Sequence, residues 1–188
     1  MNSSDCFNTF SLLSSIVIML VFITACNPVE QYVPEINYHS PVDSTYKLLE
    51  NLAYSYTGFE LNEYLNCLHE NFEFRYFSGT DTLSWGLDTE HSITDSLFSQ
   101  ACQIDLSLNG TQEYPWDEDT TGATMILLRD YSLKVYMDPA HSIEYSASGT
   151  AEFYCLQDSM GEWSLWRMWD HTESGAESWT DIKLLFSP

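Results

Sequence analysis

Apolar residues recur at helical spacing between Ser40 and Gly58. Most lie three or four positions apart, as on one buried helix face: Val42, Tyr46, Leu49, Leu52, Ala53 and Tyr56. Ser40 suits the cap position, Pro41 suits the first helical position, and Gly58 is a typical helix end. The pattern predicts a helix between these limits, followed by a second one whose buried face holds Leu61, Tyr64, Leu65 and Leu68.

The period changes to strict alternation at residues 71–77, "NFEFRYF", which predicts a strand. Gly79 and Asp81 mark a turn, and a third helix follows, capped by Asp88 or Thr89. Its buried face is predicted to hold Ile93, Leu97 and Phe98. The rest reads mainly as strands, at 102–108, 124–137, 143–157 and 162–170, with a polar loop from Asn109 to about Thr124. The tail "WTDIKLLF" fits either a last short helix or an edge strand.

This order, with helices first and a run of strands afterwards, predicts an α+β domain whose helices pack on one face of a sheet. The chain has 188 residues, of which 44% are hydrophobic and 15% aromatic, enough for a single domain with its own core. We assign residues 41–188 to this domain.

The N-terminal segment is uncharged from residue 10 to residue 25 and is shorter than the ~20 apolar residues that span a bilayer. It fits a secretory signal, although the first nine residues contain no Lys or Arg. Ile23-Thr24-Ala25-Cys26 resembles the bacterial lipobox, which implies cleavage after residue 25 and acylation of Cys26. We therefore expect a signal peptide at 1–25, and the lipidated Cys26 with a tether at 26–40. The implied location is the bacterial envelope, anchored to the membrane, at the outer membrane. The alternative is a signal-anchor helix that stays in the membrane.

Charge excludes one class of partner. The chain has 28 acidic and 6 basic side chains, a net charge of −22, which repels phosphate backbones, so no nucleic-acid partner is expected. No glycine-rich phosphate loop and no zinc spacing occurs, and "DEDTTG" at 117–122 fails as a calcium loop because Leu128 stands where a Glu ligand is required. No cofactor and no metal are predicted. Cys67, Cys102 and Cys155 allow at most one disulfide, and we expect at least one buried free thiol.

Several local patterns, in this order, resemble the nuclear transport factor 2-like superfamily, which includes polyketide-cyclase (SnoaL)-like and ketosteroid-isomerase-like members. The patterns are Tyr64-x3-Leu68-x3-Phe72-x-Phe74, then Trp85-x4-Glu90 leading to Leu97-Phe98, and finally Trp163-x-Leu165-x-Arg167-x2-Asp170. The resemblance covers residues 41–186. It implies a curved mixed or antiparallel sheet that helices wrap into a cone, with a pocket between them, but no single activity.

Enzymes of this superfamily use an acid or a histidine inside an apolar pocket, so the resemblance points to Asp170 and His91 as candidate bases. Tyr54, Tyr64 and Tyr131 are candidate hydrogen-bond donors to a ligand. The competing interpretation for Asp170 is an ion pair with Arg167 at the end of the strand.

The segment "WSLWRMWDH" concentrates three tryptophans in the last strand. Strict alternation places Trp163, Leu165, Arg167 and Trp169 on one face, and Ser164, Trp166, Met168 and Asp170 on the other. We predict that Trp163 belongs to the core and that Trp166 is a pocket wall or a dimer surface.

The sequence thus favours an envelope lipoprotein whose domain binds a small apolar or aromatic ligand without catalysis. One alternative is an isomerase or lyase with an acid or histidine base in the cone pocket. The other is a module that forms homodimers through its sheet.

Overall fold

The structure of the protein, a computed structural model, describes residues 36–116, 124–172 and 177–188. The expected signal, the Cys26 lipidation site and the acidic "DEDTTG" segment lie outside these residues. The compact unit that contains the described residues extends from Val33 to Pro188.

A six-stranded mixed sheet forms the centre of this unit. In chain order its strands are β1 (Leu68–Ser78), β2 (Asp81–Gly86), β3 (Gln103–Pro115), β4 (Thr124–Tyr136), β5 (Glu144–Gln157) and β6 (Trp163–Asp170). Their order in the sheet is β2-β1-β6-β5-β4-β3. The β1–β6 pair is parallel, and all other neighbouring pairs are antiparallel.

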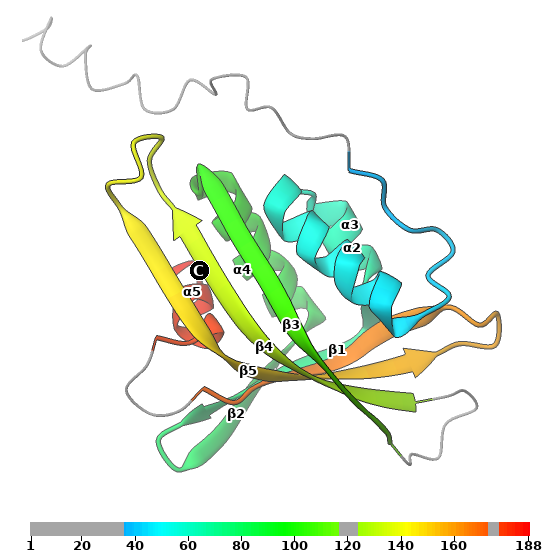
Figure 1. Cartoon of the computed structure of the whole chain (residues 1–188). Coiled ribbons are helices and arrows are strands. Elements are labelled where there is room, and N and C mark those ends of the chain that lie inside the picture. The colour runs from blue at the N-terminus through cyan, green and yellow to red at the C-terminus, as the bar shows by residue number, and fades with distance from the viewer. Residues whose placement is uncertain (1–35, 117–123, 173–176) are drawn as a thin grey trace, which may run out of the picture. The chain divides into compact units, whose positions relative to one another are not determined.

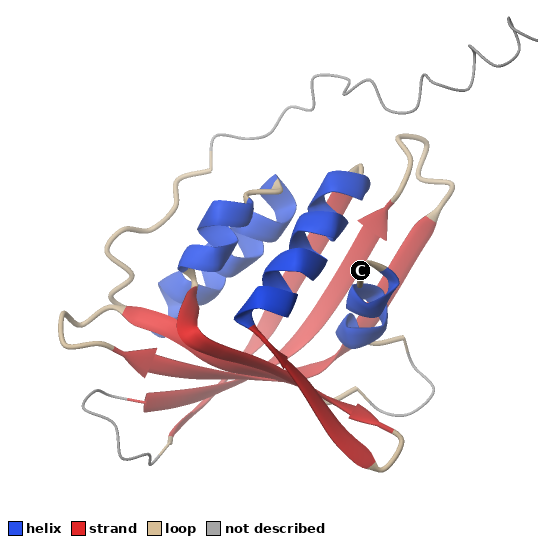
Figure 2. Cartoon of the chain, turned by 180° about the vertical axis from the view of Figure 1, so that it is seen from behind, coloured by secondary structure: helices blue, strands red, loops and turns tan. Residues whose placement is uncertain are grey.

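Four described helices lie against one face of the curved sheet: α2 (Thr45–Gly58), α3 (Leu61–Asn66), α4 (Leu87–Gln100) and α5 (Trp179–Leu185) (Figures 1 and 2). The core lies between these two layers. Fully buried residues come from the helices, such as Leu48 and Leu97, and from the strands, such as Phe74, Phe153 and Leu165. The predicted α+β class, with helices on one sheet face, is confirmed.

The first helix begins later than the sequence predicted. Ser44, not Ser40, is the cap, and its side chain accepts a hydrogen bond from the backbone of Lys47. The residues before it are held differently, because the carbonyl of Val42 accepts a hydrogen bond from the backbone N–H of Trp163, at the start of β6, at 2.8 Å. The shift also changes the buried face: Leu48 is buried, whereas Tyr46 is 66% exposed.

Three further predictions about elements were wrong, and one that the sequence left open is decided. Residues 81–86 form β2, which the sequence analysis read as a turn, and Gly86 rather than Asp88 or Thr89 is the cap of α4. The predicted polar loop after Asn109 is in part strand, because β3 continues to Pro115 and pairs there with Met125. The tail is a helix, not an edge strand.

A β-bulge in β6 changes which residues of this last strand face the core. Leu165 pairs with Cys155 but Arg167 pairs with Tyr154, so Trp166 is an extra residue without a partner on β5. Beyond the bulge, Met168 and Asp170 therefore join Leu165 on the core side. The predicted grouping of Leu165 with Arg167 and Trp169 is wrong. Trp163, predicted as core, is half-buried and packs at the margin of the core.

Residues 36–40, which the sequence analysis assigned to the tether, contact α2. The backbone N–H of His39 donates to Asn51 at 2.8 Å, and its Nε2 lies 2.8 Å from Glu50. Asn51 returns a bond to the His39 carbonyl at 2.9 Å. The chain is thus held to the domain from this point on.

Candidate functional site

The space between sheet and helices is occupied by the C-terminal helix α5. Trp179 and Lys183, one turn apart, are 1% and 0% exposed, and Ile182 and Phe186 are also buried. The Trp179 ring makes edge contacts with Tyr56 at 5.5 Å, and its Nε1 donates to the Tyr56 hydroxyl at 3.3 Å. The interior of the cone is therefore filled by the chain's own residues at this position.

Glu90, at the start of α4, is the buried acid at the centre of this interior. Its carboxylate accepts hydrogen bonds from Tyr64 Oη at 2.5 Å, Trp85 Nε1 at 2.7 Å and Thr94 Oγ1 at 3.0 Å. It also forms an ion pair with the ammonium of Lys183, and neither side chain of this pair has any exposed surface. Every donor comes from a different element or turn, so the carboxylate ties α3, β2, α4 and α5 together.

Mutual attraction keeps this pair charged. Burial by itself would raise the pKa of Glu90, but the Lys183 charge and the hydrogen bonds from Lys183, Tyr64 and Trp85 outweigh it and leave that pKa below its ordinary value. Burial would likewise lower the pKa of Lys183, but the Glu90 carboxylate raises it above its ordinary value. Burial and the Glu90 charge also raise the pKa of Tyr64. The carboxylate is thus an ionised acceptor, not a proton donor, near neutral pH.

Asp170 is the second buried acid, at the end of β6, and it holds the start of α5. One of its oxygens accepts from Thr180 N at 2.9 Å and from Thr180 Oγ1 at 2.7 Å. The other accepts from Tyr131 at 3.0 Å and from Thr172 at 2.6 Å. Because Tyr131 Oη in turn accepts from Trp179 N at 2.9 Å, two backbone N–H groups of α5 are satisfied by this cluster.

Gly149 makes room for the cluster. A Cβ atom at this position would lie 2.5 Å from Thr172 Oγ1 and 2.9 Å from Tyr131 Oη. Any larger residue would therefore push apart the hydroxyls that reach Asp170.

The structure separates the site residues that the sequence analysis grouped. Tyr64 and Tyr131 lie in the interior, each bonded to a buried carboxylate, and Asp170 is buried with them. His91 is exposed on α4, so it does not face the interior, and Tyr54 is 37% exposed on α2. The ion pair between Asp170 and Arg167, which was the competing interpretation for Asp170, is not formed. The two residues lie three positions apart on β6 and therefore face opposite sides of the sheet, and Arg167 pairs with Glu73 instead.

That opposite side carries a band of rings, here named the aromatic strip: Phe77, Trp116, Tyr154, Trp166, Trp169 and His171. Trp166 stacks on Trp116 with centroids 5.0 Å apart, and the Arg167 guanidinium lies 4.0 Å from the Trp166 centroid. Trp169 stacks on His171 at 4.8 Å.

Charged residues join the two ends of the aromatic strip. Glu73 lies 2.8 Å from Arg75 Nε and 3.0 Å from Arg167 Nε, and these hydrogen bonds outweigh burial to keep the pKa of Glu73 below its ordinary value. Glu152 accepts from Tyr154 Oη at 2.6 Å. Burial and this bond raise the pKa of Tyr154 to about 12. Two acidic side chains, Glu73 and Glu152, and two basic ones, Arg75 and Arg167, therefore lie beside the rings of the aromatic strip.

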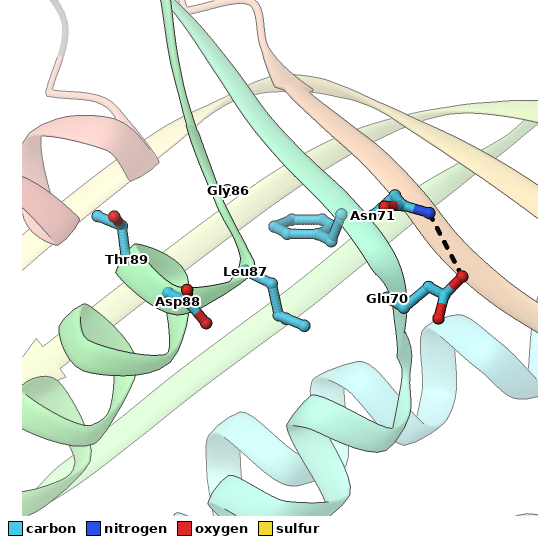
Figure 3. Close-up of a pocket in the computed structure, with 7 residues that line it drawn as sticks. Glu70, Asn71, Gly86, Leu87, Asp88 and Thr89 are labelled. Atoms are coloured by element: carbon cyan, nitrogen blue, oxygen red, sulfur yellow. Dashed lines mark hydrogen bonds between the residues drawn. The ribbon is translucent and has the colours of Figure 1, made fainter.

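A separate groove opens where β1 begins and α4 starts (Figure 3). Its volume is about 470 Å³, and its lining consists of Glu70, Asn71, Phe72, Gly86, Leu87, Asp88 and Thr89. Glu70 and Asp88 give it an acidic character. A smaller groove of about 320 Å³ is lined by Thr57, Asp105, Leu106, Ser107, Ser132 and Lys134.

Other features bear on cofactors and on the membrane. Within the described ranges no group of three or more His, Cys, Asp or Glu side chains could hold a metal ion. Over the same residues, no helix has the length and apolar character needed to cross a bilayer. Cys67 and Cys155 are buried free thiols, as expected for at least one cysteine, and burial raises the pKa of Cys67 to about 12.

Sequence reasoning missed the central role of Lys183. The available signal was its rarity: it is one of 6 basic residues in the chain and stands in the apolar tail segment "DIKLLF". A lone cation in an apolar stretch needs a buried counter-charge if the stretch is buried. Its partner Glu90, 93 positions away, appeared only within the Trp85-x4-Glu90 pattern.

Comparison with known proteins finds similarity at the level of fold. No family model matches the chain, and no curated protein matches it. Among solved structures, a candidate aromatic ring hydroxylase from Novosphingobium aromaticivorans superposes with a TM-score of 0.55 at 12% identity, over 73% of this chain and 92% of the other. A candidate scytalone dehydratase from the same species gives 0.52 at 8% identity, over 71% and 80%. A candidate dehydratase of the nuclear transport factor 2-like family from Streptomyces avermitilis gives 0.49 at 11% identity, over 68% and 92%.

Proposed function

Since the domain has the nuclear transport factor 2-like fold, which enzymes and proteins without a known activity share, we propose that it serves as an assembly module that pairs with a second copy through the aromatic strip. We propose further that Cys26 anchors this module to the membrane of the bacterial envelope. Many of the similar structures are named as enzymes, but those names describe the activities of the other proteins and are not transferred to this chain.

The observation that carries the proposal is the composition of the strip. Trp, Tyr and Arg are the residues most enriched in the energetic centres of protein interfaces, and here they lie together on one half-exposed sheet face. A two-fold interface must be self-complementary. The charges beside the strip are compatible with this requirement, because Arg75 and Arg167 lie next to the acidic Glu73, so a rotated copy would bring both signs of charge to the interface.

The filled interior supports an assembly role over catalysis. Both carboxylate oxygens of Asp170 accept hydrogen bonds, from Tyr131, Thr172 and Thr180. Glu90 is paired with Lys183. A proton shuttle needs a carboxylate that can reach a substrate. The two buried acids are instead engaged in holding α5, and His91 faces solvent.

Sedimentation equilibrium of the chain without residues 1–26 tests the proposal. We expect a dimer, and Trp166→Ala should weaken association by about 2 kcal/mol, or roughly 30-fold in Kd, as for a central interface tryptophan. Tyr54→Ala, which removes an exposed ring on the helix side, is the matched control and should leave Kd unchanged. Because each copy is strongly acidic, with −22 for the whole chain, added NaCl should tighten the dimer by screening. A monomer at every salt concentration would exclude the proposal.

A further inference from the structure

The ammonium group of Lys183 lies inside a cage of aromatic rings, here named the lysine cage. Its Nζ is 5.5 Å from the centroid of Tyr56, 5.7 Å from Tyr64 and 5.6 Å from Phe74. All three rings and the lysine are buried almost completely. Ring faces attract cations within about 6 Å, and the attraction grows when water is excluded.

A carboxylate and a hydroxyl complete the lysine cage on its remaining side. Lys183 Nζ donates to Glu90 and lies 3.4 Å from Thr94 Oγ1. The orientation of Glu90 does not depend on Lys183 alone, because Tyr64, Trp85 and Thr94 all donate hydrogen bonds to it. The cage thus combines a fixed anion, a neutral acceptor and three ring faces, which is the chemistry that recognises a primary ammonium on an apolar stem. A quaternary ammonium has no N–H to give to Glu90 and fits it less well.

The element that supplies the cation is a single short helix. α5 comprises seven residues, fewer than a helix needs for stability on its own. Thr180 in its first turn donates to Asp170, and its outer side leaves Leu184 and Leu185 44% and 58% exposed. Lys183 is the one buried charged residue of α5, so the ion pair in the lysine cage is one of the contacts that attach this helix.

From this geometry we propose that the lysine cage is a binding site for primary alkylammonium groups, which the resting protein fills with its own Lys183. α5 acts as an internal ligand, and a free alkylamine of matching length replaces it. This site is independent of the aromatic strip, which lies on the other side of the sheet, so dimer formation and amine binding can be tested separately.

Chemical rescue of Lys183→Ala is the first test. The substitution removes Cγ, Cδ, Cε and Nζ, and n-propylammonium supplies the same four atoms. We expect this amine, at ten times its Kd, to raise the Tm of the variant by about 3 to 6 °C. n-Propanol and tetramethylammonium should have much smaller effects, because the first lacks the charge and the second lacks N–H donors. Lys183→Met fills the cage and is the matched control, which should not respond.

The rescue experiment distinguishes cation recognition from the filling of an apolar cavity. Equal rescue by n-propanol would mean an apolar cavity without cation recognition and would overturn the proposal, as would the absence of rescue. If Lys183→Ala does not fold alone, the yield of folded protein on refolding with each additive gives the same comparison.

Replacement in the natural chain is tested by hydrogen exchange. The amine concentration that saturates Lys183→Ala should speed exchange of the α5 amides in the wild-type protein at least threefold, while β4 amides stay protected. Unchanged α5 exchange at several times that concentration would show that α5 is a permanent part of the core, and the proposal would fail even with rescue of the variant.

Discussion

Replacing Lys183 by methionine probes the buried ion pair directly, because methionine keeps most of the length and apolar volume but removes the charge. Glu90 then stays in the interior with three neutral donors and no cation. Breaking a buried pair by removing one partner costs about 3–5 kcal/mol, since the remaining charge is uncompensated. The zero exposure of both side chains places the expected loss in this range. For a domain of this size the Tm should fall by roughly 6 to 20 °C.

The complementary variants turn this loss into a measurement of coupling. Glu90→Gln should cost a similar amount, because it leaves Lys183 charged among three rings. The double variant should recover most of the loss, since a buried pair and a well-packed neutral substitute often have similar stability. Urea unfolding followed by tryptophan fluorescence gives all four free energies and hence the coupling energy. Single-variant losses below about 1 kcal/mol, or additive losses in the double variant, would refute the buried pair.

Two other outcomes follow from the structure, and a third follows from the N-terminal sequence. Asp170→Asn should destabilise the domain by about 1–3 kcal/mol, because the amide cannot accept every bond that Tyr131, Thr172 and Thr180 now donate; equal urea midpoints for variant and wild type would contradict this. The pKa of Glu90 is lowered in the folded state, so its stabilising effect is present above the unfolded value of about 4.3 and is lost as pH falls through the folded value. The stability gap between wild type and the double variant should therefore be flat from about pH 5 to 9 and should change only at more acidic pH. Cys26→Ser should abolish incorporation of labelled palmitate, and label that persists would exclude the lipobox.

The order of elements was predictable because it is carried by periodicity, which a single sequence displays. Where local patterns mimic a signal, prediction failed: Ser40-Pro41 looks like a helix start, yet Val42 bonds to Trp163, more than a hundred residues away. β2 escaped notice because it is a mostly exposed strand whose contact with the core is chiefly Trp85, stacked 4.4 Å from Phe74.

The site was predictable only in part, for a different reason. Asp170, Tyr64 and Tyr131 are buried, but the hydrogen-bond partners that hold them come from distant parts of the chain, which a single sequence does not display. The bulge at Trp166 likewise depends on strand pairing, and it moves Arg167 and Trp169 to the side of the sheet opposite Leu165. The pairing of Lys183 with Glu90 depends equally on tertiary structure, and the tail that carries Lys183 fitted two kinds of element.

The 93 positions that separate Lys183 of α5 from Glu90 set an order of events for folding. The parallel pairing of β1 can form only after β6 has been synthesised. Glu90 likewise has no counter-ion until Lys183 is present. Pairings so distant along the chain slow folding. Before Lys183 has been made, Glu90 has only neutral donors, and burying a carboxylate without a counter-charge is costly, so the interior closes late. The Lys183–Glu90 ion pair is therefore among the last contacts of the core that a growing chain can form.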